Sequence, residues 1–162
     1  IWFCLVGSEM CIRDRLQAHV DEGLKYARRN RLPKQIANFI PEHQGTLKMG
    51  YFYHKAKEKK IKINENDFRY NGPIPQSKET AILMLADGCE AALRAMNINA
   101  SDKEALETIS KIIYSRQKDG QLDDSNLSKG EIFLIKRAFL NVWKRIRHRR
   151  IQYPTSKNNT FS

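Results

Sequence analysis

The chain has 162 residues and a formal net charge of +11, a size that fits one domain with a single hydrophobic core. Its hydrophobic content of 41% and charged content of 29% are typical of a globular protein in water, and no apolar run approaches the roughly 20 residues of a membrane span. The three cysteines show no paired spacing, which excludes a disulfide scaffold and indicates a reducing compartment. The positive charge favours an anionic partner, such as a nucleotide, a nucleic acid or the inner membrane surface.

The first fifteen residues, IWFCLVGSEMCIRDR, differ in character from the rest of the chain. They begin without Met, are too short for a transmembrane helix, and lack the basic start of a signal peptide. Their SEMCIRDR portion resembles a translated sequencing adapter, so we expect residues 1–15 to be non-native and leave them out of the functional argument. The alternative is a genuine but unusual helix start.

Apolar residues at helical spacing predict a first helix over residues 16–29. Pro33 is placed to open a second, short helix through Ile40. Helical character resumes over residues 47–59. Residues 61–76 form the longest irregular segment, because one glycine and two prolines restrict its path.

The second half of the chain carries clear signals for helix starts. Ser77 is an N-cap for a helix that ends near Asn97 or Asn99. The sequences SDKE at 101–104 and SKGE at 128–131 are capping boxes, which open helices to about residues 118 and 150. We expect the polar tail at 155–162 to be disordered. No segment has the period of a strand, so the predicted fold is all-α.

The helix that starts at Ser77 contains the most informative residue, Asp87, with apolar residues before and after it. An ionised carboxylate buried without a partner costs several kcal/mol, so we expect a partner for Asp87: a metal, a cation or several hydrogen-bond donors. His19 and His43 lie upstream, and a buried carboxylate with imidazoles is the donor set of a hydrolytic site for a hard metal. The alternative is that Asp87 pairs with an arginine or caps a neighbouring helix.

The two histidines have different surroundings in the sequence. His19 lies on an apolar helical face one turn before Gly23, where a core histidine without a ligand is the alternative, whereas His43 follows a short helix and can project into a cleft. Both are too far from each other and from Asp87 for a zinc finger or an HExxH helix. Any site must therefore be assembled from separate helices of a bundle.

Six segments, taken in order, resemble the C-terminal HD domain of the bacterial seven-transmembrane HD phosphohydrolases, the membrane-bound PgpH type. The resemblance covers residues 16–154, and FRYxGPxPQSKE with MLAD is long enough to be specific. It implies a helical HD-domain bundle, here partial because the leading helices are missing. It also implies a parent protein embedded in the bacterial inner membrane, with this soluble piece on the cytoplasmic face. The six segments are HVDEGLKYA, LPKQIANFIPEHQGT, YFYHKAKEK, FRYNGPIPQSKETAILMLADGCEAALRAM, DGQLDDSNL and RIRHRRIQYP.

The resemblance implies that His19, His43 and Asp87 are ligands of a divalent metal pair, iron or manganese, with His43 and Asp87 at the catalytic centre. Gln44 stands where the family has a second histidine, and its amide oxygen is a poorer ligand than imidazole, which puts the second metal in doubt. The family's first metal-binding histidine and its His-Asp pair lie upstream of the segment that matches His19. Nothing in this sequence matches them.

The chemistry of the remaining side chains suggests how a substrate would bind. Arg69 and Lys78 suit a phosphate, and Tyr51, Tyr53 and Tyr70 can stack on adenine. The alternative for this region is a surface loop pinned by prolines, with Arg69 in a salt bridge.

The function implied is hydrolysis of a cyclic dinucleotide, cyclic di-AMP to linear pApA, by water that a metal pair activates. With half of the metal shell missing, we expect the chain as it stands to bind metal weakly, to be marginally stable and to be inactive. One alternative, favoured by Gln44, is a degenerate HD module that binds a nucleotide or a partner without turnover. Another is a nucleic-acid binder that uses residues 144–150; it rests on net charge alone and is disfavoured. The sequence makes no prediction of the oligomeric state.

Overall fold

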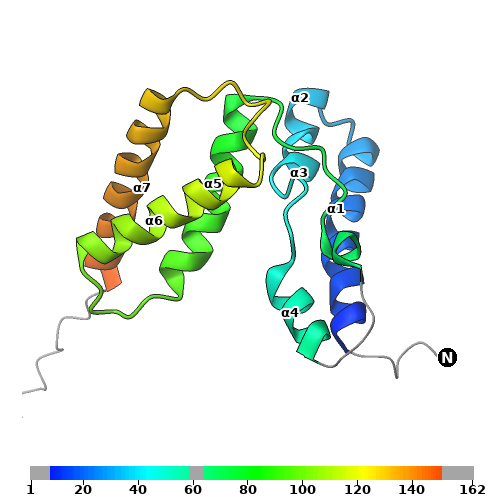
Figure 1. Cartoon of the computed structure of the whole chain (residues 1–162). Coiled ribbons are helices and arrows are strands. Elements are labelled where there is room, and N and C mark those ends of the chain that lie inside the picture. Colours follow the sequence, from blue (N-terminus) through cyan, green and yellow to red (C-terminus); the bar gives the residue numbers. More distant parts are fainter. Residues whose placement is uncertain (1–7, 59–63, 151–162) are drawn as a thin grey trace, which may run out of the picture.

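The computed structural model describes residues 8–58 and 64–150, and side chains from residue 18 to residue 147 within them. Figure 1 shows two groups of helices, α1 to α4 and α5 to α7. Within the described ranges the only β feature is an isolated antiparallel bridge between Lys48 and Arg69, so the all-α prediction is confirmed. The elements are α1 (Ser8–Arg29), α2 (Lys34–Ala37), α3 (Phe39–Glu42), α4 (Gly50–Glu58), the 3₁₀ helix η2 (Glu65–Phe68), α5 (Lys78–Arg94), α6 (Asp102–Lys118) and α7 (Lys129–Arg150).

The hydrophobic core lies mainly between α5, α6 and α7. Residues three or four apart on each helix share a face and meet those of the neighbouring helix, which removes their apolar surface from water. No helix in the described part of the chain is both long and apolar enough to cross a membrane. The principal core side chains are those of Ala81, Met84, Leu85, Cys89, Ile109, Ile113, Leu122, Ile132 and Ile135.

The helix starts predicted in the second half are confirmed. The Ser77 hydroxyl accepts a hydrogen bond from the Thr80 amide at the start of α5. Ser101 and Ser128 form capping boxes with the glutamates three residues on, at α6 and α7. At its other end, α5 stops at Arg94, earlier than predicted, because residues 97–100 form a separate turn.

The first half differs more from the prediction. Helix α1 runs without a break from Ser8, so residues 8–15 continue the helix predicted to start at 16; residues 1–7 and the predicted tail at 155–162 lie outside the described residues. Helix α4 begins at Gly50 rather than at Leu47. Residues 47–49 are extended instead, because the Met49 amide donates to the Phe68 carbonyl and the Tyr70 amide donates to the Leu47 carbonyl.

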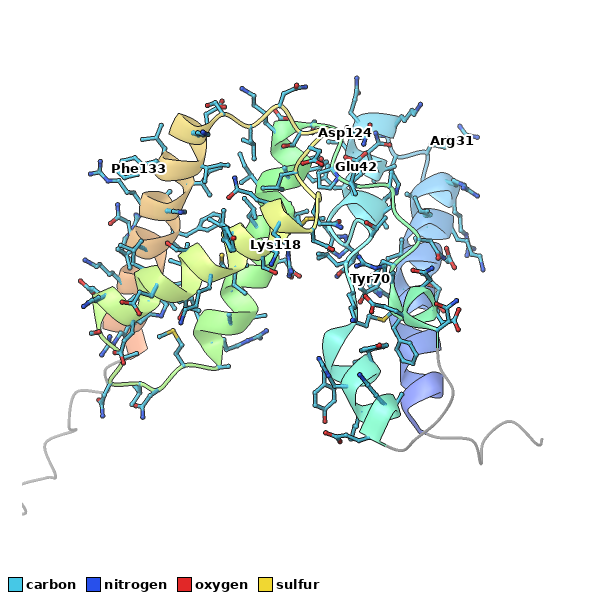
Figure 2. All side chains as sticks on the ribbon, viewed as in Figure 1. Arg31, Glu42, Tyr70, Lys118, Asp124 and Phe133 are labelled. Atoms are coloured by element: carbon cyan, nitrogen blue, oxygen red, sulfur yellow. The ribbon has the colours of Figure 1, made fainter. Side chains whose placement is uncertain are left out.

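A buried carboxylate joins the two groups of helices, and it belongs to Glu42. Its side chain, 3% exposed, accepts hydrogen bonds from the Thr80 hydroxyl (2.6 Å) and from the backbone amide of Gln76 (2.9 Å). The Gln76 side chain in turn donates to Asp124, and Figure 2 shows Glu42 and Asp124 at the junction. Two donors offset the cost of burying the charge, so α3 is fixed against the start of α5.

Candidate functional site

The two predicted histidines lie side by side. The rings of His19 on α1 and His43 after α3 meet edge to face, with 5.9 Å between their centroids. A third ring, that of Tyr70, lies 6.0 Å from His19. Helix α3 comes this close to α1 because Gly23 has no side chain: a Cβ there would stand 2.8 Å from Cγ2 of Ile40. His19 is exposed and His43 is half-buried, so neither is a core histidine.

The protonation of His43 follows from its contacts. Its Nδ1 lies 2.7 Å from the Ile40 carbonyl oxygen and 3.1 Å from that of Phe39. A carbonyl can only accept, so Nδ1 carries the proton and Nε2 keeps its lone pair. This is the orientation of a histidine that ligates a metal through Nε2. The side-chain amide of Gln44 donates to that same Nε2 across 3.1 Å.

Asp87 is exposed, and the prediction that it is buried in an apolar interior is wrong. The apolar run that surrounds it in sequence is not buried on every side, since Ile82 and Leu83 are 37% and 40% exposed. Helix α5 buries one face in the core and leaves the rest of its surface uncovered.

Asp87 nevertheless lies on the face of α5 that is turned toward the histidines. It follows Thr80 by two turns and Met84 by one turn. Thr80 bonds to Glu42, and a Cβ on Gly45 would stand 2.6 Å from Met84 Cε. Burial chiefly, and then the charge of Asp87, raises the pKa of Tyr70. The aspartate thus acts on the ring that touches His19.

The residues present fit only part of a metal shell. In the part of the chain that the structure describes, no three His, Cys, Asp or Glu side chains lie close enough together to hold a metal ion. Two imidazoles are suitable donors for iron or manganese, with Nε2 of His43 in contact with the Gln44 amide in this structure. A metal that they bind needs further ligands beside them.

The turn after His43 is held by a residue that sequence reasoning missed. Gln121, 1% exposed, accepts from the Thr46 amide (3.0 Å) and donates to the Thr46 hydroxyl (2.8 Å) and to the Asp119 carboxylate (3.0 Å). Gly45 has φ +54°, and a Cβ there would stand 2.5 Å from Gln121 Oε1. The DGQLDD segment reads as an ordinary polar turn, so no local signal reveals this burial.

The two cations proposed for phosphate already have carboxylate partners. Arg69 donates to both carboxylate oxygens of Asp119, at 3.2 and 3.1 Å, and to the Thr46 carbonyl. Its pKa is raised, chiefly by the hydrogen bond to Asp119. Lys78 lies 2.6 Å from a carboxylate oxygen of Glu131. These partners agree with the alternative interpretation, in which Arg69 forms a salt bridge in a loop pinned by prolines.

The three predicted tyrosines separate in space. Tyr70 is the one that contacts His19. Tyr53 lies against the Phe68 ring and under the Lys48 ammonium, which is 3.7 Å from the ring centre. Tyr51 is 67% exposed on α4. The geometry therefore favours Tyr70 over the other two as a residue beside the site.

The basic cluster at residues 144–150 is partly used within the fold. Lys144 pairs with Asp102 at 2.5 Å. The Arg147 guanidinium lies over the Trp143 ring and donates to the Ala100 carbonyl. These internal partners weaken the case for a nucleic-acid surface on α7.

Two cavities of different size lie in different parts of the described structure. A cavity of about 60 Å³ lies between α1 and the segments around Gly45 and Tyr70, and Val20 is also in its wall. A larger one, about 460 Å³, lies between α5 and α7, with Phe139 and Trp143 in its mostly apolar wall. The larger cavity contains none of the predicted site residues.

Comparisons with known proteins agree with this arrangement. No protein-family model matches the chain. The uncharacterized protein slr0104 of Synechocystis sp. is 47% identical over 146 residues, which cover 87% of this chain and 18% of that protein. The cyclic-di-AMP phosphodiesterase PgpH of Bacillus subtilis is 38% identical over 137 residues, 85% of this chain and 19% of that protein. The chain thus spans less than a fifth of either curated relative.

Among solved structures, the HD domain of L. monocytogenes phosphodiesterase PgpH in complex with cyclic-di-AMP is similar throughout. The TM-score is 0.82 at 35% identity, over 90% of this chain and 68% of that one. The helical fold and this similarity place the chain among the HD domains of the hydrolase superfamily. The chain belongs to the family of PgpH phosphodiesterase HD domains. The family predicted from six sequence segments is therefore confirmed.

Proposed function

We propose that this domain is the catalytic part of a metal-dependent phosphodiesterase that hydrolyses cyclic di-AMP to linear pApA. The observation that carries the proposal is the similarity, over most of the chain, to an HD domain that binds cyclic-di-AMP. The paired imidazoles of His19 and His43 support it. We further propose that the parent protein is membrane-embedded, with this domain on the cytoplasmic face of the bacterial inner membrane.

The residues of this chain that would contribute to binding a divalent metal pair, iron or manganese, are His19, His43 and Asp87, beside further ligands. Such ions, when bound, lower the pKa of water toward neutrality and stabilise charge on phosphoryl oxygens. The chain's own part is positioning. The Ile40 carbonyl keeps the proton of His43 on Nδ1 and so leaves the lone pair on Nε2, to which Gln44 donates in this structure. Asp87 would supply the negative charge that favours cations at this face of α5.

A second candidate function is a degenerate HD module that binds the nucleotide without turnover. The contact that favours it is that between Gln44 and His43, because the amide occupies the lone pair that a metal would need. The described residues also lack a group of three ligands. For this reason we expect the chain alone to bind metal weakly and to be inactive, and the decisive assay uses the longer parent protein.

The test measures both binding and turnover. The parent protein, reconstituted with Mn²⁺ or Fe²⁺, is incubated with cyclic di-AMP, linear pApA is quantified by chromatography, and nucleotide binding is measured by calorimetry. We expect product from the wild type and a loss of at least about a hundredfold, roughly 2.7 kcal/mol, in H43A. H54A is the matched control, because His54 is exposed on α4. Binding without product from either metal would establish the second candidate, and absence of both would refute the proposal.

A further inference from the structure

A further guanidinium, that of Arg116, lies near Asp87. Arg116, near the end of α6, lies against α5 at Gly88, directly after Asp87. A Cβ on Gly88 would stand 3.3 Å from Arg116 Nη2 and 3.3 Å from Cγ2 of Ile112. The glycine therefore provides the space in which the arginine reaches across α5 to the position of Asp87.

Arg116 is a cation that the fold leaves incompletely paired. Its Nε is buried, and it has no hydrogen-bond partner in the described part of the chain. Burial lowers its pKa, with opposing contributions from Asp119, Cys89 and Asp87, but a guanidinium stays charged in proteins. A half-buried cation with an unpaired donor is costly. Arg69 and Lys78, in contrast, are hydrogen-bonded to carboxylates.

Arg116 is also connected to the turn that carries His43. The Gln121 amide donates to the Arg116 carbonyl, and the Gln121 side chain binds Thr46. Asp87, which Arg116 approaches, lies on the face of α5 turned toward His43. The Arg116 guanidinium therefore lies beside Gly88, the residue after Asp87, and the Arg116 backbone is linked through Gln121 to the turn that follows His43.

We propose that Arg116, beside Gly88 and Asp87, binds a phosphate of the dinucleotide. The inference rests on the proposed function and replaces Arg69 and Lys78 with Arg116 as the principal cation for the substrate. A guanidinium presents five donors in a fork that matches two phosphate oxygens. Asp87 repels a phosphate until a cation neutralises it, so binding to Arg116 is stronger when metal is present.

The experiment compares nucleotides with and without a phosphate. Binding of cyclic di-AMP, AMP and adenosine to the parent protein with Mn²⁺ is measured by calorimetry for the wild type, R116A and R116Q. We expect R116A to weaken the binding of cyclic di-AMP and of AMP roughly tenfold, about 1.4 kcal/mol. The affinity for adenosine should stay within about twofold of the wild-type value. R94A is the control, because Arg94 is exposed on the neighbouring helix and pairs with Glu90. R116Q, which keeps the length of the side chain, is used if R116A fails to fold.

The outcomes separate this inference from the proposed function. If the wild type binds no cyclic di-AMP, the proposed function and this inference fail together. If the wild type binds and both Arg116 variants bind equally well, only the inference is overturned. Equal losses of affinity for AMP and for adenosine would assign Arg116 a structural role and would also overturn the inference. Weakening confined to the two phosphate-bearing ligands supports it.

Discussion

Replacing Gly45 with alanine tests whether the turn after His43 is fixed by the contacts described. Gly45 has φ +54°, where a non-glycine residue costs about 1–2 kcal/mol. The added Cβ would stand 2.5 Å from Gln121 Oε1 and 2.6 Å from Met84 Cε. Met84 can move its terminal methyl at little cost. Gln121 cannot move without weakening its two bonds to Thr46, each worth about 1 kcal/mol net.

We therefore expect G45A to lower the free energy of unfolding by about 2–4 kcal/mol. The measurement is urea denaturation followed by far-UV circular dichroism, with linear extrapolation to water. G130A is the matched control. Gly130 lies in the first turn of α7, the nearest atom to its Cβ position is 4.0 Å away, and alanine favours a helix by up to about 1 kcal/mol. A G45A protein within about 0.5 kcal/mol of the wild type would refute the proposed rigidity of this turn.

Three further predictions concern single groups. Cys89 is 2% exposed and burial raises its pKa to about 11; in a variant whose other cysteines are serine, we expect iodoacetamide at pH 8 to label it only after unfolding, and labelling of the native protein would contradict its burial. The folded pKa is raised, so its contribution to stability is complete below about pH 9 and is lost as the pH rises through about 11. The hydrogen bond from Lys78 lowers the pKa of Glu131 to about 2. The contribution of Glu131 to the free energy of unfolding is therefore complete above pH 4.5 and is lost as the pH falls through about 2. Carboxyl NMR should show the Glu131 pKa moving up toward 4.5 in K78M, and an unchanged value would remove Lys78 as the cause. S101A should cost about 1 kcal/mol of stability by urea denaturation, because the Ser101 hydroxyl caps α6, and no loss would show that the cap is dispensable.

Local interactions explain why the second half was predicted well. The caps at Ser77, Ser101 and Ser128 depend on residues within three positions along the chain, so the sequence contains all the partners. The site was predicted in part. The six segments placed His19 and His43 in one family pattern, and the structure brings their rings together.

The sequence by itself determined where α5, α6 and α7 begin, the all-α class and the family, because each depends on spacing or on a local motif. The tertiary structure decided which carboxylate is buried. Glu42 meets its donors from residues 76 and 80 and is enclosed, whereas Asp87, in the more apolar segment, is exposed. It also brought Gln121 to the turn after His43 and Arg116 to Gly88, next to Asp87. Burial and pairing depend on which helix faces meet, and contacts across such distances in the chain leave no pattern in the residues around each partner.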